Sequence, residues 1–111
     1  MKSVKIIQIL HRLAELLRKN GHPAQADYVA AIATIAEWDF SACCPALSSG
    51  AMWGGSGSVW EVGEFNFASE KRTFYLMLIE LFEAMRSEAI QGVGAEQTVR
   101  VLKQWLAAGI V

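Results

Sequence analysis

Apolar residues first recur at three- and four-residue intervals between residues 4 and 19. Such a pattern, with polar side chains on the opposite face, predicts an amphipathic helix. Asn20 and Gly21 are typical of a helix end, and Pro23 is well suited to the first turn of a second helix. The two helices are therefore expected to form an antiparallel hairpin. The apolar face of the first contains Ile6, Ile9, Leu10, Leu13, Leu16 and Leu17.

The second helix is predicted from Pro23 to Trp38, and it is rich in alanine. Its narrow apolar face allows a neighbouring helix to approach closely. A short helical segment is expected after Asp39, as far as Leu47, with Pro45 limiting its length. The predicted apolar face of the second helix consists of Tyr28, Val29, Ile32, Ile35 and Ala36.

Helical periodicity then disappears between residues 48 and 66, a segment that contains five of the nine glycines and two of the four tryptophans. Irregular connections of this length are uncommon within small domains, and they tend to be functional or self-packed. Within the segment, Ser58 and Glu61 have the spacing of a capping box. We therefore expect a long glycine-rich loop with one short helical turn that ends near Gly63.

Two more helices are predicted after the loop. The first runs from Ser69, as N-cap, to Gln91, with Phe74, Met77, Leu78, Leu81, Phe82 and Met85 on one face. Gly92 and Gly94 separate it from a helix over 95–108, whose inward residues are Val99, Leu102, Trp105 and Leu106. The expected fold is all-α: a four-helix bundle of two helical hairpins with a long glycine-rich central loop.

Composition favours one folded domain over residues 1–111, because 53% of the residues are hydrophobic and 19% are charged. No apolar run approaches the roughly 20 residues of a membrane span, so none is expected. The adjacent Cys43 and Cys44 offer no disulfide framework. We expect a cytoplasmic protein in which these cysteines are small packed residues.

Charge is distributed unevenly along the chain. Between Asn20 and Glu70 there is no lysine or arginine, whereas the segment contains six acidic residues. Phosphate groups and nucleic-acid backbones require cations, so the segment argues against nucleic acid as a partner. A basic protein partner fits this charge better. The acidic residues are Asp27, Glu37, Asp39, Glu61, Glu64 and Glu70.

The sequence contains no complete motif for phosphate binding, serine hydrolysis or metal binding. The run Gly54 to Ser58 lacks the lysine of a P-loop and fails G-x-S-x-G at its last residue. His11 and Glu15 are the sole histidine–carboxylate pair at i, i+4 spacing, and no C-x-x-C occurs. We therefore predict no catalytic residues, no metal site and no cofactor. An alternative stays open, in which the glycine-rich turn binds a small ligand or anion.

Aromatic residues alternate with the carboxylates of the acidic segment, as at Trp38 and Trp60. Aromatic anchors supply much of the energy of protein interfaces, and one sign of charge steers a complementary partner. Trp53 is flanked by glycines, so we expect it to be hard to bury. The candidate partner-binding residues are Trp38, Asp39, Trp53, Gly54, Gly55, Ser56, Gly57, Ser58, Trp60, Glu61 and Glu64.

The chain resembles a family of small bacterial helical proteins of unknown function with a Gly-Gly-x-Gly-Ser turn. The resemblance lies in Leu13 to Gly21, in Met52-Trp53-Gly54-Gly55-Ser56-Gly57-Ser58 with Glu61, and in Phe74 to Met85. Met often stands at position 56 in the family and Asp at position 61, so the match departs at both. The resemblance implies the architecture and a loose association with toxin-immunity loci.

Three hypotheses follow from the sequence. The first is a non-enzymatic protein-binding module, most concretely an immunity-type protein that neutralises a basic bacterial toxin domain with residues 52–67. The second is a small ligand-binding protein or enzyme that uses Ser56, Ser58 and Glu61. The third is a self-associating structural protein, a helical homodimer that covers the excess of apolar residues.

Overall fold

A computed structural model of the protein describes residues 2–92 and 94–110. Helices account for all the regular structure in this part of the chain, and no strand occurs there. The all-α class predicted from the sequence is therefore confirmed. The elements are α1 (Lys2–Lys19), α2 (Pro23–Trp38), α3 (Phe40–Leu47), α4 (Gly50–Trp53), the 3₁₀ turn η1 (Val59–Glu61), α5 (Ala68–Ser87) and α6 (Ala95–Ala108).

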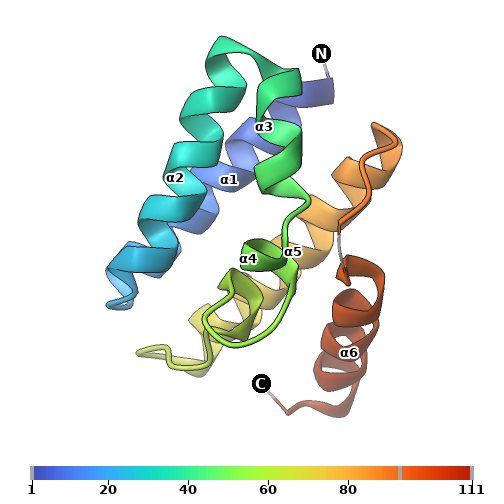
Figure 1. The fold of residues 1–111 in the computed structure, drawn as a ribbon. Coiled ribbons are helices and arrows are strands. Elements are labelled where there is room, and N and C mark those ends of the chain that lie inside the picture. The colour runs from blue at the N-terminus through green and yellow to red at the C-terminus, as the bar shows by residue number, and fades with distance from the viewer. Residues whose placement is uncertain (1, 93, 111) are drawn as a thin grey trace.

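Helix α1 lies at the centre of the arrangement, in contact with α2 on one side and α5 on the other (Figure 1). Helix α3 packs on α2, and α6 packs on α5. The helices α3, α2, α1, α5 and α6 therefore pack side by side in that order. Helix α6 makes its main helix contact with α5. A closed four-helix bundle is not confirmed, because bundle closure would also bring α6 against the first hairpin.

The apolar face predicted for α1 forms the centre of the core. Ile6, Ile9, Leu10, Leu13 and Leu17 are fully buried, as expected from their spacing. The helix ends in a Schellman motif, in which the His22 N–H donates to the Leu17 carbonyl and Gly21 takes a φ of +80°. The motif turns the chain directly into α2, so the predicted hairpin of the first two helices is observed.

Both ends of the third predicted helix were placed incorrectly. The N-cap of α5 is Phe67 and not Ser69, which lies inside the first turn. At the other end α5 stops at Ser87, because Ala89 adopts a φ of +59° and the Ile90 N–H donates to the Met85 carbonyl. This second Schellman motif uses alanine where glycine is usual, and for that reason the sequence gives no stop signal there.

The segment predicted as a nineteen-residue loop contains both α4 and η1. The helical turn near Ser58 is present, but the capping box is not, because no side-chain cap hydrogen bond occurs at η1. The Ser58 hydroxyl instead donates to the Gly54 carbonyl at 3.1 Å. The serine therefore closes the glycine-rich turn behind it and does not cap the helix ahead.

Candidate functional site

The candidate partner-binding residues fall into two separate places. Trp38 and Asp39 lie where α2 ends, and Trp38 is 88% exposed. Gly57 lies at the opposite end of α2, where its carbonyl accepts a hydrogen bond from Gln25 at 3.4 Å. A helix of this length spans about 24 Å, at about 1.5 Å per residue. The sequence-predicted residues therefore do not form one continuous surface.

Trp53 is buried, so the expectation that it would be difficult to bury is wrong. Its side chain is 1% exposed, and its indole N–H donates to the Leu47 carbonyl at 3.0 Å. The Thr98 hydroxyl donates to the Trp53 carbonyl at 3.2 Å. Gly92 packs so closely on the indole ring that an added Cβ would lie 2.9 Å from Cδ1. Trp53 joins α4 to the start of α6 and offers no surface to a partner.

The glycine-rich turn is held in shape by its own polar groups. The Gly54 carbonyl accepts hydrogen bonds from the Ser58 hydroxyl and, at 2.6 Å, from the Trp60 indole N–H. Gly54 has no room for a side chain, since a Cβ there would lie 2.6 Å from the Gly50 carbonyl oxygen. Ser58 is buried by these contacts. The tip of the turn, Gly55-Ser56-Gly57, is left exposed on a fixed base.

An aromatic pocket of about 360 Å³ opens beside this turn, between η1, α5 and α6. The Trp105 ring lies between the other two aromatic rings, with its centroid 5.8 Å from that of Tyr75 and 6.4 Å from that of Trp60. Burial raises the pKa of the Tyr75 hydroxyl above its ordinary value. The pocket is lined by Trp60, Glu61, Gly63, Lys71, Tyr75, Trp105 and Ile110.

Ion pairs with other elements neutralise part of the negative charge expected for residues 20–70. In the described part of the chain, Glu61 and Glu64 have no cationic partner, and both are exposed. Glu61 lines the aromatic pocket, and Glu64 directly follows Gly63, which also lines it. The carboxylates of Glu61 and Glu64 therefore place negative charge at or beside the pocket. Asp27 pairs with Arg18 and Glu70 pairs with Lys19, whereas Glu37 contacts the imidazole of His11.

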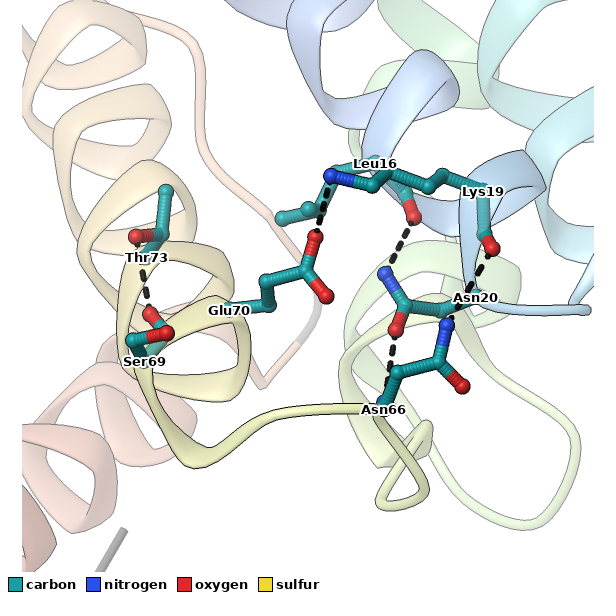
Figure 2. Close-up of polar contacts among 7 residues, drawn as sticks. All are labelled: Leu16, Lys19, Asn20, Asn66, Ser69, Glu70 and Thr73. Atoms are coloured by element: carbon teal, nitrogen blue, oxygen red, sulfur yellow. Dashed lines mark hydrogen bonds and ion pairs between the residues drawn. The ribbon is translucent and has the colours of Figure 1, made fainter.

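A polar cluster that the sequence did not reveal fixes residues 64–70 to the end of α1 (Figure 2). Buried Asn20 donates to the Leu16 carbonyl at 2.9 Å and accepts from the Asn66 backbone N–H at 2.7 Å. The Lys19 ammonium lies 2.8 Å from the Glu70 carboxylate, which raises the lysine pKa. The first-hairpin turn thereby positions the chain that leaves the aromatic pocket and enters α5.

The described residues give little support to a metal site, an anion site or a nucleophilic cysteine. No group of three or more metal-ligating side chains comes together among them. The two hollows beside Gly54 and Gly57 have no lysine or arginine among their described lining residues, which weakens an anion-binding role for the turn. Burial raises the pKa of the Cys43 thiol to about 11, so a nucleophilic thiolate is disfavoured at neutral pH.

No described helix combines the length and apolar character that crossing a membrane requires. Comparisons with protein-family models, with curated proteins and with solved structures found no match to this chain. The resemblance to a small bacterial family of unknown function, loosely associated with toxin-immunity loci, stays a prediction.

Proposed function

We propose that this chain is a non-enzymatic protein-binding module that recognises a basic protein partner through the face containing Glu61, Glu64 and the aromatic pocket. The observation that carries the proposal is the position of two exposed carboxylates, which have no cationic partner among the described residues, at or beside an open pocket with three aromatic walls. Interface hot spots commonly combine an aromatic cluster with surrounding polar residues, and carboxylates beside such a cluster accelerate association with a basic partner.

The rigidity of the face supports the proposal. Trp60 is oriented by its hydrogen bond to the Gly54 carbonyl, and the Asn20 and Asn66 contacts fix the chain just beyond Glu64. A surface that is ordered before binding loses less conformational entropy when a partner docks. In its most concrete form, we propose an immunity-type protein that covers the active site of a basic bacterial toxin domain.

A charge-reversal pull-down tests the proposal. We expect the tagged protein to recover a basic protein from lysate of the source organism, and the Glu61→Lys, Glu64→Lys double variant to lose it. With the purified partner, affinity is expected to fall about tenfold or more for the double variant. Glu15→Lys, Glu83→Lys makes the same charge change on other faces and should retain binding. Equal affinities for all three proteins would contradict the proposal.

Self-association is the second candidate function, and a specific observation favours it. Trp38 and Ile35 lie three residues apart on α2, and both are exposed. A second copy of the chain could cover them. We expect Trp38→Ala to lower the average mass measured by concentration-dependent light scattering if these residues form a dimer contact. A wild-type protein that stays monomeric at high concentration would eliminate this candidate.

A further inference from the structure

The aromatic pocket brings three aromatic side chains around one space. Its three rings come from three separate elements, η1, α5 and α6, and Trp105 is inclined at 34° to Trp60 and at 46° to Tyr75. Tryptophan and tyrosine attract organic cations through the negative faces of their rings. The pocket volume of about 360 Å³ is sufficient for a small head group.

One cation already lies near these rings. The Lys71 ammonium is 6.0 Å from the centroid of Tyr75, and Lys71 lines the pocket. This separation is at the outer limit for a cation–π contact, and Lys71 has no ion-pair partner in the described part of the chain. The lysine stem is flexible, so a cation that fits more closely can displace the ammonium.

Once the Lys71 ammonium is displaced, the charge left on the described pocket wall is the Glu61 carboxylate, which favours a cation over a neutral apolar occupant. Glu61 is the one carboxylate on the described pocket wall, and it is exposed and unpaired. A neutral ligand would gain contact with the rings alone, whereas a cation would gain both the rings and the carboxylate.

We propose that the aromatic pocket binds the head group of an organic cation, an alkylammonium or a guanidinium. The inference goes beyond the proposed function, because it concerns a class of ligand. The same head group could be presented by an arginine or lysine side chain of a protein or by a free small molecule, and the test separates these sources.

The test is a titration followed by NMR of the tryptophan indole N–H groups. Choline and its neutral isostere 3,3-dimethyl-1-butanol are compared, and we expect saturable shifts at Trp60 and Trp105 with choline binding about fivefold or more tightly. Glu61→Gln should weaken choline binding. Lys71→Met should strengthen it, because the competing ammonium is removed. Trp38→Leu is the matched control at a distant tryptophan and should leave the titration unchanged.

Two results would overturn the proposal. One is equal binding of choline and the neutral isostere, or no binding of either. The other is weaker choline binding by Lys71→Met, which would show that the ammonium does not compete with choline for the rings. Nα-acetyl-argininamide is titrated in parallel: a preference for it points to a protein side chain, and a preference for choline points to a free molecule. A preference for either cation supports the proposal. Neither result depends on whether the pull-down recovers a basic protein partner.

Discussion

Trp53→Ala is expected to lower the free energy of unfolding by about 3–5 kcal/mol. The indole is 1% exposed and contacts Gly92, and its N–H donates to the Leu47 carbonyl. Truncation would leave a cavity between α4 and the start of α6 and would remove the donor from a buried carbonyl. Urea denaturation followed by circular dichroism at 222 nm measures the change.

Trp38→Ala is the matched control for this prediction. The same side chain is removed at a position that is 88% exposed, so we expect a change of no more than about 0.5 kcal/mol in the monomer. A loss below about 1 kcal/mol for Trp53→Ala would show that the tryptophan is not packed as described. It would also restore Trp53 to the candidate partner-binding surface.

The helices with strong local signals could be predicted from the sequence. The predicted bounds of α2 and α6 agree with the structure, because Pro23 starts one helix and glycines flank the other. The end of α5 could not be predicted. Its stop depends on Ala89 at a positive φ, a conformation that alanine disfavours and that the sequence therefore does not signal.

The burial of Trp53 had almost no local signal. Its covering residues, Gly92 and Thr98, are distant in the sequence, and flanking glycines suggested exposure. Gly92 was interpreted only as a helix break, although its missing side chain provides the space for the indole. Close packing between remote segments leaves no periodic pattern, which explains why this contact was missed.

The candidate site was predicted only in part. Trp60, Glu61 and Glu64 were identified from the alternation of aromatic and acidic residues, and the structure places them at or beside one pocket. Two of the pocket walls were not identified: Trp105 was assigned to the core, and Tyr75 was not considered. Each lies on a helix whose face was predicted, but the angle between α5 and α6 brings their rings together, and sequence periodicity does not specify that angle.

The acidic character of residues 20–70 was overestimated for a related reason. Counting charges along the chain ignores partners on other elements, and α1 supplies two cations, Arg18 and Lys19, to carboxylates of this segment. The Arg18–Asp27 pair is exposed and contributes little stability, whereas the Glu70 side chain is only 13% exposed. In the described part of the chain, Asp39, Glu61 and Glu64 have no cationic partner, and of these Glu61 and Glu64 lie at or beside the pocket.

Asn20→Asp is expected to lower the free energy of unfolding by about 1–3 kcal/mol at pH 7. The Asn20 amide donates to the Leu16 carbonyl at 2.9 Å (Figure 2). A carboxylate has the same shape, but it has no N–H to donate, so an anionic oxygen would face the carbonyl oxygen in a buried position. Desolvation and this repulsion both raise the pKa of the introduced carboxyl in the folded state.

The pH dependence follows from the sign of that change. An unfolded aspartate titrates near about pH 3.9. A folded pKa above this value means that the folded variant binds more protons than the unfolded variant. Its loss of stability relative to wild type should therefore grow as pH rises from about 4 to 7.

Asn66→Asp is the matched control, since the Asn66 side chain is exposed and its contact with the Lys19 carbonyl is long, at 3.5 Å. Equal, pH-independent losses for both variants would show that Asn20 does not anchor residues 64–70. A large loss at Asn20 alone would identify the first-hairpin turn as the support that holds the chain between the aromatic pocket and α5.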